Sequence, residues 1–232
     1  MATFASVAII YTTTKSLTEQ TLTETATVAA DRVTWELKAI QNVAIQAGCN
    51  PKLSSPIYTN SQKQREVDTI AANFGLDRGA SIDYEGHGSN GIEYADREYY
   101  KAAMEGKTTI TEPMIGKLSV IIAAPIWKNG ELNTEVVGCV YFVPDEEFLN
   151  DVVRAIKVNE NGAAYIIDKN GNTIADIDMQ LVRDGENIQK IAEEDTNYTA
   201  LAQAHEKMEA GETGFAEYVS GGISKYIGYA PI

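Results

Sequence analysis

One phrase occurs twice in this chain. Residues 105–108 (EGKT) lead to residues 124–126 (API), and residues 210–213 (AGET) lead to residues 230–232 (API). The glycine and the proline of the phrase recur after 105 and 106 residues. In each copy a helical pattern precedes the glycine, and an extended, Thr-rich or aromatic stretch follows it. A repeat of this period indicates two duplicated domains rather than a solenoid.

Composition agrees with two small domains. A chain of 232 residues divides into two modules of roughly 100 residues, each able to bury its own core. The net charge of −14 argues against a nucleic-acid partner, because phosphate binding needs clustered Lys and Arg. The negative charge also argues against a protein that binds along the surface of an anionic membrane. The simplest interpretation of the acidity is a solubilising surface.

Two features of the sequence leave alternatives open. Cys49 and Cys139 are the only cysteines, and they could form one disulfide or stay as two buried thiols. No segment reaches the roughly 18 apolar residues that span a bilayer. Residues 4–11 (FASVAIIY) are apolar but too short, and they read either as the end of a membrane helix or as the start of an ordinary soluble helix.

A long amphipathic helix is predicted from about residue 12 to residue 48. Its apolar residues recur at steps of three and four, and they are Leu22, Ala26, Ala29, Val33, Leu37, Ile40, Ala44 and Ala47. No Gly or Pro interrupts the pattern before Gly48, which suits a C-terminal stop. Such a helix either packs along two modules or pairs with a copy of itself.

The first module follows this helix. We expect a loop over 50–60, a helix over 61–74, a strand near 80–84, and a helix over 97–104 with Asp96 as its N-cap. Extended stretches follow at 108–111, 118–126 and 136–143. Asn129-Gly130 between the last two predicts a hairpin, because this dipeptide accepts positive φ.

The second module repeats the plan. A helix over 145–157 leads to a hairpin over 163–175, a helix over 188–209, and strands over 214–220 and 224–232. Each module therefore combines an antiparallel sheet with helices, an α+β pattern. By analogy with 136–143 we expect the second sheet to lack its last strand, with the full-length protein continuing beyond Ile232.

Motifs for cofactors, metals and catalysis are weak. Gly86-x-Gly88-x-x-Gly91 matches the dinucleotide fingerprint, but no long helix follows it, which favours a loop. The segment from Asp168 lacks the Gly and Glu of a calcium loop, which favours a turn. His87 and His205 are the only histidines, and neither has a second His at ligand spacing, which argues against a triad or a zinc site. We therefore expect no enzyme, cofactor or metal.

A different signal comes from residues 94–100 (YADREYY). Arg97 is expected in the first turn of a helix, where its planar guanidinium suits a carboxylate. Tyr99 and Tyr100 beside it would supply aromatic walls and hydroxyl donors. In the alternative interpretation Arg97 pairs with an acidic neighbour at the surface and the tyrosines pack in the core. The residues alone favour neither.

Taken in order, the elements resemble those of the double Cache sensor domain. The resemblance covers most of the chain. It lies in the long helix and in the segments DREYYKAAMEGKT (96–108), PIWKNGE (125–131), VVGCVYFVPDEEF (136–148), YIIDKNGNTIAD (165–176) and GETGFAEY with YIGYAPI (211–232). Each motif is weak alone, and their order over about 220 residues is specific.

The resemblance implies two PAS-like modules on a long helix: residues 1–49 as the helix, 50–145 as a membrane-distal ligand-binding module, and 146–232 as a membrane-proximal module. It implies an extracytoplasmic sensor of a membrane-anchored receptor, most simply a chemotaxis receptor, with a histidine kinase or a cyclic-dinucleotide enzyme as alternatives. A homodimer through the helix is expected in the full receptor. The start at 4–11 then reads as the stub of a membrane helix.

The resemblance also implies the site. In the amino-acid-binding branch an Arg-x-Trp-Tyr motif holds the ligand's carboxylate, and Arg97-x-Tyr99-Tyr100 matches it with Tyr for Trp. Tyr94, Trp127 and Tyr141 complete the expected ligand-binding set. Residues 138–144 contain no acid to hold an α-amine, and Tyr141 takes that place. A buried ammonium without a counter-charge costs several kcal/mol. We therefore expect a small carboxylate rather than a standard amino acid.

Overall fold

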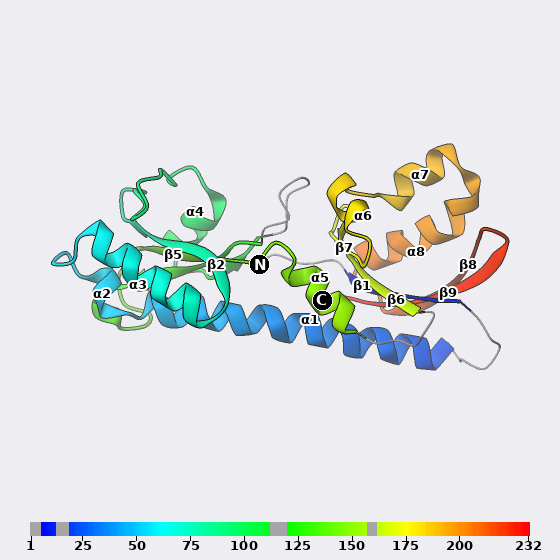
Figure 1. Cartoon of the computed structure of the whole chain (residues 1–232), viewed down its shortest axis with the longest axis horizontal. Coiled ribbons are helices and arrows are strands. Elements are labelled where there is room, and N and C mark those ends of the chain that lie inside the picture. Colours follow the sequence, from blue (N-terminus) through cyan, green and yellow to red (C-terminus); the bar gives the residue numbers. More distant parts are fainter. Residues whose placement is uncertain (1–5, 13–18, 112–119, 157–161) are drawn as a thin grey trace. The chain divides into compact units, whose positions relative to one another are not determined.

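The chain is described here by a computed structural model that covers residues 6–12, 19–111, 120–156 and 162–232. It separates into two compact units (Figure 1). Of the described residues, unit 1 takes 37–111 and 120–146, and unit 2 takes 6–12, 19–36, 147–156 and 162–232. Both units combine an antiparallel sheet with helices, which confirms the α+β prediction.

The sheet of unit 1 has the order β2-β5-β4-β3. Its strands are β2 (Leu76–Asp83), β3 (Thr109–Ile110), β4 (Ile122–Trp127) and β5 (Val136–Pro144). All pair antiparallel, with Ala80 opposite Tyr141 and Ala123 opposite Tyr141 on the other side. The predicted turn joins β4 to β5 through η1 (Lys128–Gly130), where Asn129 and Gly130 have φ of 57° and 77°. Asn129 tolerates this conformation, as the sequence predicted.

Four helices accompany this sheet: the last part of α1 (Glu19–Gly48), α2 (Pro51–Ser54), α3 (Asn60–Asn73) and α4 (Glu98–Met104). Thr59 caps α3 in a reciprocal capping box with Gln62. Gly48 lets the end of α1 approach β4, because a Cβ there would lie 2.1 Å from the carbonyl oxygen of Pro125. Cys49 and Cys139 are both free thiols, which settles the open question of a disulfide.

The sheet of unit 2 corrects the prediction for the N-terminal segment. Its order is β7-β6-β1-β9-β8, with β6 (Gly162–Ile167), β7 (Thr173–Ala175), β8 (Gly214–Ser220) and β9 (Ile223–Ala230). β1 (Ser6–Thr12) is its central strand and pairs antiparallel with both β6 and β9. Residues 6–12 therefore form neither a membrane-helix stub nor a soluble helix. Val7, Ala8 and Ile9 are fully buried, so the apolar run reflects a strand buried on both faces.

The position of β1 also corrects the expectation of a missing last strand. In unit 1 β5 lies between β2 and β4, and in unit 2 β1 lies between β6 and β9. The second sheet is therefore completed by a segment from the other end of the described chain. Since residue 12 belongs to β1, α1 is shorter than predicted and begins at Glu19. The predicted apolar stripe of α1 is buried throughout, as expected.

Helices α5 (Phe148–Ala155), α6 (Met179–Asp184), α7 (Ile188–Glu194) and α8 (Thr199–Glu209) belong to unit 2 (Figure 1). The sequence predicted one helix over 188–209, but the structure divides it. Asp195 accepts a hydrogen bond from the backbone of Asn197 and caps η2 (Thr196–Tyr198) between α7 and α8. Asp178, with its side chain bonded to the amide of Gln180, starts the unpredicted helix α6.

The repeated phrase has the same structure in both units. Gly106 after α4 and Gly211 after α8 have φ of 80° and 75°. The next residue in each copy reaches back five positions, from Lys107 N to Ala102 O and from Glu212 N to Lys207 O, both at 3.0 Å. These are the same helix-ending bonds of a Schellman motif. The duplicated phrase thus marks the end of the equivalent helix in each module.

No helix of the described chain is both long and apolar enough to cross a membrane.

Candidate functional site

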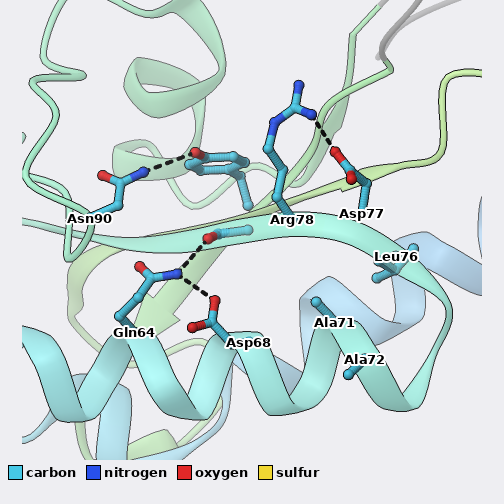
Figure 2. Close-up of a pocket in the computed structure, with 10 residues that line it drawn as sticks. Gln64, Asp68, Ala71, Ala72, Leu76, Asp77, Arg78 and Asn90 are labelled. Carbon is cyan, nitrogen blue, oxygen red and sulfur yellow. Dashed lines mark hydrogen bonds and ion pairs between the residues drawn. The ribbon is translucent and has the colours of Figure 1, made fainter.

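A pocket of about 390 Å³ lies in unit 1 at β2, which is an edge strand of the described sheet (Figure 2). Its polar lining comes from several elements: Gln64 and Asp68 of α3, Asp77 and Arg78 of β2, Asn90 of the following loop, and Tyr141 of β5. Figure 2 shows the α3 residues on one side of the β2 ribbon and Asn90 on the other. The pocket has the size of a small-metabolite site.

The α3 side of the pocket is held by a hydrogen-bond network. Gln64 Nε2 donates to Asp68 Oδ1 at 2.7 Å and to the carbonyl of Gly79 at 2.9 Å (Figure 2). The Ser89 hydroxyl donates to Gln64 Oε1 at 2.6 Å and accepts from the backbone amide of Ser81 at 3.1 Å. These bonds fix the orientation of the Gln64 amide and tie α3 to β2 and to the loop after it.

On the other side three groups form a polar cluster. The hydroxyls of Tyr94 and Tyr141 lie 2.7 Å apart, and Asn90 Nδ2 donates to Tyr94 Oη at 2.7 Å and to Tyr141 Oη at 3.5 Å. Burial raises the pKa of Tyr141 well above its usual value, and the hydrogen bond from Tyr94 adds to this. The Tyr141 hydroxyl therefore stays neutral and can still donate a hydrogen bond to an anion.

Arg78 is the cation of the pocket. Its guanidinium forms an ion pair with Asp77, and both side chains are about half exposed. An exposed ion pair contributes little, about 0–1 kcal/mol. A ligand carboxylate could therefore compete with Asp77 for Arg78 at low cost.

Arg97 lies outside this pocket and outside its predicted position in the helix. It is the N-cap of α4, with extended φ and ψ of −77° and 131° and no capping bond from its side chain. The prediction of Asp96 as N-cap was thus one residue early. The side chain of Arg97 is exposed and makes no hydrogen bond or ion pair with any described residue, although its charge acts on Tyr99.

Four of the other predicted site residues, Tyr94, Tyr99, Tyr100 and Tyr141, share one buried cluster. Ring centroids lie 5.4 Å apart for Tyr94–Tyr141 and 5.8 Å apart for Tyr99–Tyr141. The Tyr100 hydroxyl donates to the carbonyls of Tyr84 at 2.8 Å and Asp83 at 3.3 Å. Trp127 is buried at the end of β4, next to Gly106.

Five polar lining residues were missed by sequence reasoning: Gln64, Asp68, Asp77, Arg78 and Asn90. Arg97 stands next to aromatic residues in the sequence, whereas Arg78 does not. A usable signal existed in Gln64 and Asp68, which are spaced i, i+4 and therefore lie on one face of the predicted helix. Nothing in the local sequence places that face beside β2.

The glycine-rich segment after β2 and the segment from Asp168 have the loop and turn structure that the sequence predicted. After Gly91 the next helix begins only at Glu98, and the segment from Gly86 forms short antiparallel bridges, Ile82 with Gly88 and His87 with Glu93. Asp168 accepts from the amides of Asn170 and Asn172 and from the Asn172 side chain, each at 2.9 Å. These bonds form the turn that the sequence predicted at this position.

Comparisons with known proteins identify the family. The Cache domain family (dCache_1) matches residues 5–232, and the chain belongs to this family. No curated protein sequence matches the chain. Solved structures share the fold at low identity.

The sensory domain of the Campylobacter jejuni chemoreceptor Tlp3 (CcmL) with isoleucine bound has a TM-score of 0.63 and 11% identity, covering 92% of this chain and 91% of that one. The extracellular domain of the putative histidine kinase mmHK1S-Z2 has a TM-score of 0.59 and 17% identity, covering 92% and 96%. An extracellular ligand-binding receptor from Desulfohalobium retbaense has a TM-score of 0.62 and 13% identity. There the match covers 92% of this chain but 40% of the receptor.

Proposed function

We propose that this chain is the ligand-binding sensor domain of a transmembrane signalling receptor, and that unit 1 binds a small metabolite in the pocket beside β2. The observation that carries the proposal is the convergence of Arg78, Asn90 and the neutral Tyr141 hydroxyl on one pocket. Membership of the Cache family and the shared fold of chemoreceptor and kinase sensor domains support the sensor role.

The ligand we propose is a small organic carboxylate. Arg78 offers a planar fork of donors, and Asn90 and Tyr141 add neutral donors to the same pocket. Arg97 is the rival anchor, because it is exposed, lies close enough to act on Tyr99, and has no partner among the described residues. The two possible anchors predict different effects of mutation on ligand affinity.

A matched pair of variants separates them. Calorimetric titration with a panel of mono- and dicarboxylates should find a ligand that stabilises the chain. Arg78→Gln should weaken that ligand by at least about tenfold, since a charge-assisted bond is worth about 1.5–3 kcal/mol, whereas Arg97→Gln should leave it unchanged. Weaker binding in Arg97→Gln with unchanged binding in Arg78→Gln would assign the anchor to Arg97. No binding of any organic acid would contradict the ligand class.

An amino acid is the second candidate, and one observation favours it. Residues 138–144 contain no acid to hold an α-amine, but the pocket also contains Asp68 and Asp77. Either carboxylate could pair with an ammonium group, and the Tlp3 sensory domain was solved with isoleucine bound. Adding L-amino acids to the same titrations tests this, with Asp68→Asn expected to weaken an amino acid and spare a plain carboxylate.

The setting of the domain is also a proposal. We place it outside the cytoplasmic membrane in a homodimer, with a chemotaxis signalling region as the output module and a histidine kinase as the alternative. Trp35 on α1 is 76% exposed and Val28 69%, so two large apolar side chains stand seven residues apart on the exposed side of the helix, where a second copy could cover them. Fusing the chain to a known receptor's signalling region, and measuring output with the ligand found above, tests the sensor role in cells.

A further inference from the structure

The turn that follows β2 brings one histidine and several carboxylates together in unit 1. Asp83, Glu85 and His87 each offer one ligand atom, and these atoms all lie within 4.8 Å of one another. We propose that this turn binds a divalent transition-metal ion, zinc foremost, through His87, Asp83 and Glu85. The sequence argued against zinc because no second histidine stands at ligand spacing, but the fold supplies carboxylates in its place.

The turn is preorganised by its backbone. Asp83 Oδ1 accepts from the amides of Glu85 at 3.1 Å and His87 at 2.8 Å, and the Asp83 amide donates to the carbonyl of His87 at 3.0 Å. Gly86 has φ of 96°, which closes the turn. Tyr100 of α4 donates its hydroxyl to the carbonyls of Tyr84 and Asp83 and anchors the turn from outside. Holding ligands in place before the metal arrives lowers the cost of binding.

The spacing suits a tetrahedral ion. His87 Nδ1 lies 3.4 Å from Asp83 Oδ1. Two ligands bonded to zinc at about 2.0–2.1 Å, at the tetrahedral angle, stand roughly 3.3–3.4 Å apart. The two atoms therefore already have the separation of neighbouring zinc ligands. The side chains of His87 and Asp83 are 55% and 37% exposed, so water can complete the coordination.

The other ring nitrogen of His87 also faces a carboxylate. Glu93 is the cross-strand partner of His87, and its Oε1 lies 3.6 Å from His87 Nε2. Metal-bound histidines commonly present their second nitrogen to a carboxylate, which fixes the tautomer and raises the basicity of the ligand.

The ligand set also selects the metal. One imidazole nitrogen with two carboxylates suits zinc and its neighbours in the first transition row, whereas calcium and magnesium prefer oxygen alone. The two carboxylates offset the charge of a divalent ion, and Glu93 adds further negative potential. The site is separate from the pocket residues that we assign to the metabolite.

Isothermal titration of the full chain, without a histidine tag, with ZnCl₂ tests the proposal. We expect one zinc per chain and a rise in melting temperature that a chelator reverses. His87→Ala and the milder Glu85→Gln should each weaken zinc by at least about tenfold. Glu131→Gln, which changes an exposed carboxylate elsewhere in unit 1, should leave it unchanged. Circular dichroism of each variant checks that it is folded.

Cobalt provides a direct view of the ligands. Co²⁺ bound at a tetrahedral site with a nitrogen ligand should show visible d–d absorption that disappears in His87→Ala. Absence of zinc binding in the wild-type chain would overturn the proposal. So would equal zinc affinity in the wild type and His87→Ala, which would point to scattered surface carboxylates. Calcium binding as tight as zinc binding would overturn the role of the imidazole.

Discussion

Tyr141 illustrates how a single residue links the fold to the pocket. Its position on β5 places it opposite both Ala80 and Ala123, so small neighbours on each side leave room for the ring. Its ring contacts Tyr94 and Tyr99, and its hydroxyl faces Asn90. An aromatic residue with a polar tip fits such a half-buried position.

Replacing Tyr141 by Phe should separate packing from hydrogen bonding. The ring remains, but the buried hydroxyl of Tyr94 loses one of its two hydrogen-bond partners and keeps Asn90, which costs about 0.5–1.5 kcal/mol in the free energy of unfolding. Ligand affinity should also fall, because one donor of the pocket disappears. Chemical denaturation and calorimetry measure the two effects. Tyr218→Phe in unit 2 is the control and should leave ligand affinity unchanged. If Tyr141→Phe also left the affinity unchanged, Tyr141 would not belong to the binding site.

His205 is the corresponding buried polar residue of unit 2. It is fully buried, its Nε2 lies 2.7 Å from the Tyr165 hydroxyl, and its Nδ1 has no hydrogen-bond partner in the described part of the chain. Burial lowers its pKa from 6.5 to about 4, because the charged ring would lose its solvation.

This pKa predicts a pH dependence of stability. Above about pH 6.5 the ring is neutral in both states. As the pH falls from 6.5 towards 4, the unfolded chain takes up the proton first, so the free energy of unfolding decreases by at most about 1.4 kcal/mol per pH unit. His205→Gln should flatten this slope in urea denaturation between pH 4 and 6.5. Burial raises the pKa values of Asp176 and Glu186, which act in the opposite sense, so the difference between wild type and variant is the informative quantity.

Among the elements, α1 contacts each sheet through a glycine. Besides Gly48 against β4, Gly228 of β9 meets the start of the helix, where a Cβ would lie 2.4 Å from the Leu22 carbonyl oxygen. In both contacts the glycine lets the backbone of α1 lie directly against the backbone of a strand. The apolar stripe of α1 could be predicted from its period, but these two approaches could not, because they depend on which strand the helix covers.

A proline substitution in strand β1 tests the strand order of the unit 2 sheet. As the central strand of the unit 2 sheet, β1 forms hydrogen bonds with strands on both sides. A proline in β1 therefore removes one of these hydrogen bonds, whereas sheets tolerate proline only in edge strands. Ile9→Pro should abolish hydrogen-exchange protection in unit 2 while amides of unit 1 keep theirs. Ile9→Val, which keeps the backbone, should cost only about 0.5–1.5 kcal/mol. Retained protection of β6 and β9 in Ile9→Pro would show that β1 does not complete the sheet.

At the scale of the whole molecule the two units are unequal versions of one module. Both end an equivalent helix with the same bonds and place equivalent strands in the same order. Unit 1 has the metabolite pocket and the metal-binding turn that we propose. Unit 2 has a buried Tyr165–His205 pair in its core and takes one of its strands from the N-terminal end of the described chain.

Association through α1 can be tested with the two tryptophans. Trp35 is exposed and Trp127 is buried, so in Trp127→Phe the fluorescence reports on Trp35 alone. If α1 pairs with a second copy, quenching of Trp35 by acrylamide should fall as the protein concentration rises. Sedimentation over the same concentrations measures the mass. Constant quenching with a monomeric mass at high concentration would argue against pairing through this face in the isolated domain.

The α+β class, the buried stripe of α1 and the Asn129-Gly130 turn could all be predicted from the sequence, and the repeated phrase predicted two modules. Each depends on periodicity or on a local backbone preference, which neighbouring residues encode. The tertiary structure decided that residues 6–12 complete a distant sheet and that Arg78 rather than Arg97 lines the pocket. It also placed His87 between carboxylates. These outcomes depend on which strand pairs with which, and that choice is made by burial across more than a hundred residues of chain.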